Sequence, residues 1–144
     1  MIENIHLLSV SNTEGFLTEI KSRNHKLTAD EPIESGGTDK GVDAYELLLA
    51  SLGTCKAITM RMYANRKNFP LKDVKINLKH YKINAADCDG CKTKEGKIDK
   101  IDIEVEITGD LSEAQKARIL EIGEKCPVQR TILSEVIINT TSKI

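Results

Sequence analysis

An apolar-rich stretch from Asp43 to Lys67 constrains the fold of this chain most, because no proline interrupts it. Its first half is apolar nearly all round, which a helix tolerates only when it is buried on several sides. Asp43 followed by Glu46 predicts an N-cap and its capping-box partner. Cys55 lies at the centre of the stretch. It shares a stripe at helical spacing with Leu48, Leu52, Ile58, Thr59 and Met62. We therefore predict a long, buried central helix that carries a thiol.

Three short segments before this helix predict strands, at residues 5–10, 15–20 and 24–29. Asn12 falls between the first two segments, in a stretch that favours a turn. A loop rich in glycine and acidic residues, residues 30–42, then leads into the helix.

Two alternating segments after Pro70 predict a long hairpin. In the first, Val74, Ile76 and Leu78 alternate with basic and polar residues; in the second, Ile101, Ile103, Val105 and Ile107 alternate with acidic residues. Antiparallel pairing would set opposite charges across from each other, each pair contributing roughly 0.2–1 kcal/mol. The tip of this hairpin, at about residues 84–97, would carry Cys88 and Cys91.

A second helix is predicted after the hairpin, with Ser112 as its N-cap and Gln115 as the capping-box partner. Its apolar spacing continues to about Lys125. Cys126 precedes a proline and should therefore lie at or just past the helix end. Residues 135–140 predict a closing strand. The order of elements predicts an α+β fold, organised as a single domain over residues 1–144.

Composition excludes several classes of function. The net charge is −1 and aromatic residues make up 3% of the chain, which favours neither nucleic acid nor an anionic membrane as a partner. The longest apolar run is too short to span a bilayer. The first six residues lack the pattern of a signal peptide, so we expect a cytoplasmic protein. Four cysteines in such a protein suggest catalysis, redox chemistry or metal binding more than structural disulfides.

Each cysteine also has a plain structural interpretation. Cys55 and Cys126 could be small core residues, and spacing alone cannot show whether they meet. If they do meet, a disulfide or sulfenic acid chemistry becomes possible. Cys88 and Cys91 could form a redox loop, half of a metal site with His80, or an exposed turn; a structural zinc site wants four ligands.

Two segments together identify a family resemblance. Glu46-Leu-Leu-Leu-Ala-Ser-Leu-Gly-Thr-Cys55 and Lys125-Cys126-Pro127-Val128 resemble the OsmC/Ohr family of thiol-dependent hydroperoxide reductases. The similarity extends over nearly the whole chain. Further motifs point to an OsmC-like or YhfA-like subgroup: Ala29-Asp30-Glu31-Pro32, Gly36-Gly37 and Cys126-Pro-Val-Gln-Arg-Thr131.

The resemblance implies an OsmC-like fold, an intertwined homodimer with antiparallel sheets wrapped around central helices, and an active site at the subunit interface. It implies Cys55 as the cysteine that attacks peroxide and Cys126 as the one that resolves it, with Glu46 at the family's glutamate position. It also implies that no metal or organic cofactor takes part. A dithiol would be the reductant, and the two sulfurs are expected close together in a largely apolar pocket.

One departure concerns the arginine that family peroxidases carry before the central helix, paired to that glutamate. Residues 26–42 contain no arginine, and their only cations are Lys26 and Lys40. The candidate substitutes are Arg23, His25 and Arg130, although arginine and lysine are not equivalent donors.

Three functions follow as hypotheses. The first is a thiol peroxidase acting on organic hydroperoxides in an oxidative stress response, through Cys55 and Cys126. The second is a non-catalytic OsmC-fold protein that binds a small ligand. The third is a redox-sensing or metal-sensing protein that uses Cys88 and Cys91.

Overall fold

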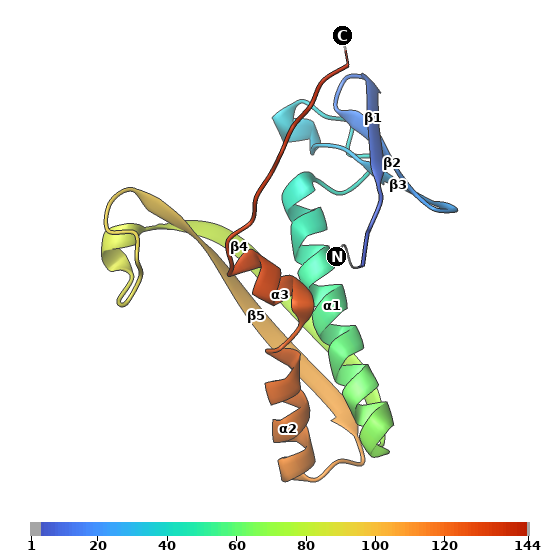
Figure 1. Cartoon of the computed structure of the whole chain (residues 1–144), viewed down its shortest axis with the longest axis vertical. Coiled ribbons are helices and arrows are strands. Elements are labelled where there is room, and N and C mark those ends of the chain that lie inside the picture. The colour runs from blue at the N-terminus through green and yellow to red at the C-terminus, as the bar shows by residue number, and fades with distance from the viewer. Residues whose placement is uncertain (1–3, 144) are drawn as a thin grey trace. The chain divides into compact units, whose positions relative to one another are not determined.

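A computed structural model describes residues 4–143, so the first three residues of the N-terminal stretch lie outside it (Figure 1). The fold is α+β, as predicted, with antiparallel sheets and one long helix. Contacts divide the chain into two compact units, Met1–Leu48 and Leu49–Ile144. None of the described helices is long and apolar enough to cross a membrane.

The first unit contains an antiparallel sheet in the order β1-β2-β3. Its strands are β1 (Ser9–Glu14), β2 (Leu17–Ser22) and β3 (His25–Ala29). The third strand was predicted correctly, whereas β1 begins later than residues 5–10 suggested. The predicted turn at Asn12 is wrong, because this residue pairs within β1 and its side-chain amide donates to the carbonyl oxygens of Gly15 and Leu17 (both 3.0 Å). The turn follows instead at Gly15, whose φ of 58° suits glycine.

The loop after β3 is organised around the carboxylate of Asp30, which is only 4% exposed. It accepts hydrogen bonds from the backbone N–H groups of Glu31 (2.8 Å) and Lys40 (3.1 Å) and from the hydroxyl of Thr38. A Cβ at Gly37 would collide with the carbonyl oxygen of Glu31, so only glycine fits there. The loop also contains the short 3-10 helix η1 (Ile33–Ser35). These bonds lower the pKa of Asp30, the Thr38 hydroxyl having the largest effect.

Replacing Asp30 by asparagine is expected to destabilise the chain at neutral pH. A carboxyl whose pKa is lowered by folding contributes stability above its unfolded pKa, about 3.9, and that stability is lost as pH falls through the folded value. The difference in unfolding free energy between wild type and Asp30→Asn should therefore narrow below about pH 4. Urea unfolding between pH 3 and 7 measures it. The exposed neighbour Asp39, as Asp39→Asn, is the control; a constant difference across this range would contradict the prediction.

Helix α1 (Ala44–Lys67) begins with the predicted capping box. The backbone N–H of Glu46 donates to the Asp43 carboxylate (2.7 Å), and the N–H of Asp43 donates to the Glu46 carboxylate (2.9 Å). The predicted burial of its first half on several sides is wrong for the single chain, since Leu48 is 39% exposed. Further along, Ile58 and Met62 are also exposed.

The second unit contains the predicted hairpin, formed by β4 (Leu71–Asn84) and β5 (Lys97–Gly109). Its register sets Lys75 against Glu106 and Lys79 against Asp102, which confirms the predicted pairing of opposite charges. The tip falls between Asn84 and Lys97, and it includes the short 3-10 helix η2 (Ala85–Asp87). The hairpin thus forms a long twisted ribbon (Figure 1).

Helix α2 (Glu113–Gly123) also has its predicted capping box, with Ser112 and Gln115 exchanging hydrogen bonds. A third helix, α3 (Pro127–Ile132), follows and was not predicted. Cys126 is its N-cap and proline occupies its first position, where the missing N–H costs nothing. The predicted strand at 135–140 is wrong, because this segment forms no strand pairing within the described residues.

The core of the second unit lies where α1 and α2 pack with the hairpin. Met60, Tyr63, Ala64, Leu71 and Ile119 form it, surrounded by partly buried residues of β4 and β5. The two helices approach closely, since a Cβ at Gly123 would stand 3.0 Å from the sulfur of Met60. This contact brings the end of α2, and with it Cys126, beside the middle of α1.

Candidate functional site

The structure brings two distant thiols together. Cys55 lies midway along α1 and is partly exposed, whereas Cys126, between α2 and α3, is 0% exposed. The Cys55 side chain lies close enough to the Cys126 thiol to raise its pKa, and neither cysteine is part of a disulfide. The spatial proximity expected for this pair is therefore present in one chain.

Burial raises the pKa of the Cys126 thiol, because a thiolate loses its hydration there. Two neighbours oppose this effect. The backbone N–H of Gln129 donates to the Cys126 sulfur (3.4 Å), and the nearby positive charge of Lys56 also favours the thiolate. The neighbouring Cys55 side chain raises the pKa further. Burial is the largest of these effects, so the net change in the Cys126 pKa is upward.

The sequence analysis did not identify Lys56 as a site residue. In the structure this lysine is only 1% exposed. Its ammonium donates to the carbonyl oxygen of Gly123 (3.2 Å) and lies 3.5 Å from the carboxylate of Glu124. One signal could have found it: Lys56 stands four residues after Leu52 and four before Met60, both buried. A lysine on that stripe departs from the usual exposure of this residue type.

Gln129, whose backbone N–H donates to the Cys126 sulfur, also lines a pocket of about 400 Å³. Its walls are mainly apolar, with three polar residues among them. They comprise Leu52, Ile101, Ile103, Ile132 and Leu133, together with Asp99, Glu124 and Gln129. The amide nitrogen of Gln129 donates to Glu124 (3.0 Å), whereas its amide oxygen is buried and has no hydrogen-bond partner among residues 4–143. Such an acceptor is suited to a donor that arrives with a ligand.

Of the other predicted site residues, Glu46, Arg23 and His25 belong to the first unit and Arg130 to the second. Glu46 caps the start of α1 and belongs to the first unit. Arg23 lies at the turn between β2 and β3, and His25 is the first residue of β3; both are exposed. Arg130 is exposed on α3, four residues after Cys126. The roles of these four residues stay predictions.

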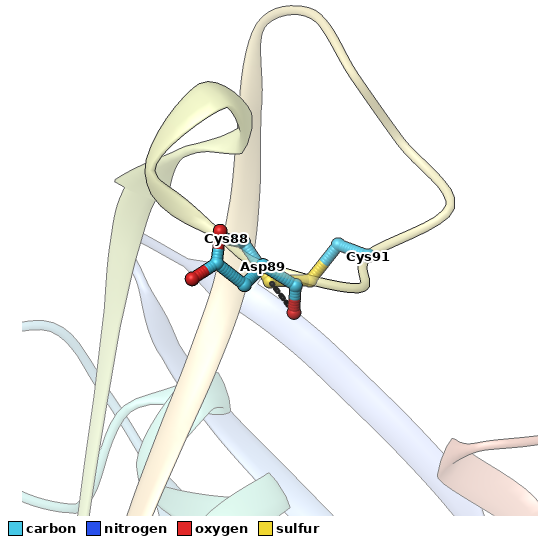
Figure 2. The surroundings of a disulfide bond; sticks show 3 residues. All are labelled: Cys88, Asp89 and Cys91. Atoms are coloured by element: carbon cyan, nitrogen blue, oxygen red, sulfur yellow. Dashed lines mark hydrogen bonds between the residues drawn. A yellow bond between two sulfur atoms is a disulfide. The ribbon is translucent and has the colours of Figure 1, made fainter.

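Cys88 and Cys91 form a disulfide at the tip of the hairpin, with their Cα atoms 5.7 Å apart (Figure 2). His80, the suggested additional metal ligand, hydrogen-bonds to Asp99 (2.8 Å). In the described part of the chain, no group of three or more His, Cys, Asp and Glu residues is arranged to hold a metal ion. The structure therefore places this pair as a bridged loop.

Comparisons with known proteins agree with this architecture. Residues 37–141 match the family described as OsmC-like protein. No curated protein matches the sequence significantly. An OsmC-like protein from Mycoplasma pneumoniae has a similar structure, with a TM-score of 0.72 and 19% identity; the match covers 92% of this chain and 89% of that one.

Two further solved structures carry functional names. The organic hydroperoxide resistance protein OsmC from Legionella pneumophila matches with a TM-score of 0.63 and 19% identity, covering 92% of this chain and 91% of that one. The organic hydroperoxide resistance protein OhrB of Bacillus subtilis matches with a TM-score of 0.59 and 15% identity, covering 89% and 90%. At these identities the likeness establishes a shared fold.

Proposed function

Because this chain belongs to the OsmC-like family, we propose that it reduces organic hydroperoxides with a dithiol as reductant, through Cys55 and Cys126. The observation that carries the proposal is the proximity of the two thiols, since the Cys55 side chain raises the pKa of Cys126. Two structures of similar fold are named organic hydroperoxide resistance proteins, which supports the choice of substrate class.

The exposure of the two sulfurs supports the order in which they react. Cys55 is partly exposed and so meets the hydroperoxide first, its thiolate attacking the terminal oxygen while the O–O bond breaks and the alcohol leaves. The resulting sulfenic acid has Cys126 beside it. Attack by the Cys126 thiolate on the Cys55 sulfur forms a disulfide and releases water. An external dithiol then returns both cysteines to thiols and becomes a disulfide itself.

The pocket lined by Gln129 supports an organic rather than an inorganic peroxide as substrate. Its apolar walls would contact the alkyl or aryl group of the substrate, and the unpartnered amide oxygen of Gln129 could accept a hydrogen bond from the hydroperoxide O–H. Hydrogen peroxide can donate the same hydrogen bond, but it has no organic group to contact the apolar walls. We therefore expect a preference for organic hydroperoxides.

The test is catalytic turnover. Purified protein with dithiothreitol should consume cumene hydroperoxide over many turnovers, with a higher kcat/KM than for hydrogen peroxide. Intact mass after one equivalent of peroxide should show a Cys55–Cys126 disulfide. Absence of both turnover and this disulfide would overturn the proposal.

A homodimer and a cytoplasmic location complete the proposal. Apolar side chains that the single chain leaves exposed support the dimer: Ile58, Met62, Val136, Ile137 and Ile138. Exposed apolar groups of this extent typically mark an interface, and the extended segment at 135–140 retains the sequence pattern of a strand. Light scattering should report about twice the chain mass of 16.0 kDa; a monomer would contradict this part.

A further inference from the structure

The unequal burial of the two sulfurs has a consequence for the reductive half of the cycle. A dithiol from solution can reach Cys55, which is partly exposed, but not Cys126, which is fully enclosed. Attack on a disulfide expels the other sulfur as a thiolate. Cys126 is therefore the leaving group, and its negative charge must form inside the protein, where hydration cannot stabilise it.

Lys56 is built into the surroundings of this leaving group. It follows Cys55 in the chain, and its ammonium is held at the α2–α3 corner by Gly123 (3.2 Å) and Glu124 (3.5 Å). Glu124 in turn accepts from the Gln129 side chain (3.0 Å), and the Gln129 backbone N–H donates to the Cys126 sulfur (3.4 Å). These contacts form a chain from the Lys56 ammonium through Glu124 and Gln129 to the Cys126 sulfur.

A lysine with only a structural role would destabilise the fold at this position. Burying an ammonium costs free energy unless it is well paired, and Glu124, its one carboxylate partner among the described residues, is 68% exposed. An ammonium has three N–H donors, and the described residues account for two of them. The third donor thus remains for an anion that forms nearby.

Resting on the proposed function, we infer that Lys56 is the charge partner that stabilises the Cys126 thiolate when the Cys55–Cys126 disulfide is reduced. One sulfur of the external dithiol bonds to Cys55 as the S–S bond breaks, and both electrons of that bond stay on Cys126. The second sulfur then displaces Cys55, so one disulfide is consumed and another forms. Cys55, Lys56 and Glu124 are the titratable groups around Cys126 that take part.

The first test measures Cys126 alone. In protein carrying Cys55→Ser, Cys88→Ser and Cys91→Ser, thiolate absorbance at 240 nm titrates the remaining thiol. Adding Lys56→Gln, which keeps a donor for Gly123 but removes the charge, should raise the thiol pKa by about one unit, a tenfold change in the equilibrium. Lys56→Arg should titrate like Lys56. Lys125→Met, which removes an exposed charge next to Cys126, is the matched control and should have a smaller effect.

The second test measures the reaction. In otherwise wild-type protein oxidised at Cys55 and Cys126, Lys56→Gln should slow reduction by dithiothreitol roughly three- to tenfold. Glu124 is exposed, so Glu124→Gln should leave the fold intact. Because it removes the carboxylate paired with Lys56, it should accelerate the reduction by dithiothreitol. This acceleration should vanish when Lys56→Gln is also present. An unchanged thiol pKa in Lys56→Gln, or an unchanged rate in Glu124→Gln, overturns the inference. Failure of peroxide to form the disulfide would instead overturn the proposed function, because the titration does not depend on it.

Discussion

Replacing Cys55 by serine is expected to lower dithiol-dependent consumption of cumene hydroperoxide by at least about two orders of magnitude. A serine hydroxyl is not ionised at neutral pH and is a far weaker nucleophile toward the O–O bond than a thiolate. Cys126 cannot replace Cys55, because it is fully buried and burial raises its pKa. Peroxide loss measured with a colorimetric hydroperoxide assay gives the rate.

Cys126→Ser should give a different product from Cys55→Ser, so comparing the two variants separates the roles of the two cysteines. Cys55 would still react once and gain one oxygen atom, visible by intact mass, but no disulfide with residue 126 could form. The double variant Cys88→Ser/Cys91→Ser is the matched control, and it should turn over within about twofold of wild type since these residues are bridged at the hairpin tip. Cys55→Ser consuming peroxide at the wild-type rate would exclude the mechanism.

Ile119→Ala should lower the free energy of unfolding by roughly 3 kcal/mol, within the 2–5 kcal/mol typical of such truncations. Ile119 on α2 is 0% exposed and belongs to the core with Met60, Tyr63, Ala64 and Leu71. Because both helices contribute to this core, the cavity cannot close without moving one of them. Urea unfolding at neutral pH, with disulfides intact, measures the change.

The next residue along the same helix provides the comparison. Leu120 is 39% exposed, so Leu120→Ala removes a similar volume with less loss of burial and should cost under about 1 kcal/mol. Equal losses for the two variants would mean that the described core is not what stabilises α2. A selective loss of peroxidase turnover in Ile119→Ala would be consistent with α2 positioning Cys126.

Local sequence determined the caps and the hairpin. Asp43 with Glu46, and Ser112 with Gln115, specify helix starts through hydrogen bonds within three residues. The alternation of β4 and β5, with basic residues opposite acidic ones, specifies their pairing. These features depend on side chains close along the chain or on a repeating pattern, so they could be predicted without coordinates.

Strand limits and helix burial were predicted less well, because both depend on partners that are distant in sequence. The segment at 135–140 has the pattern of a strand, yet a strand needs a partner, and within the described residues it has none. The exposed Ile58 and Met62 were expected on the buried stripe of α1. Which face of a helix is buried depends on the elements that pack against it, and the sequence of the helix alone does not specify those elements.

The sequence by itself determined that this chain carries a long central helix with a mid-helix cysteine, and a second cysteine at a helix end before proline. Only the tertiary structure decided that these thiols lie close together and that the buried Lys56 lies near Cys126. The physical reason is the close approach of α1 and α2 at Gly123, which sets residues distant in sequence side by side.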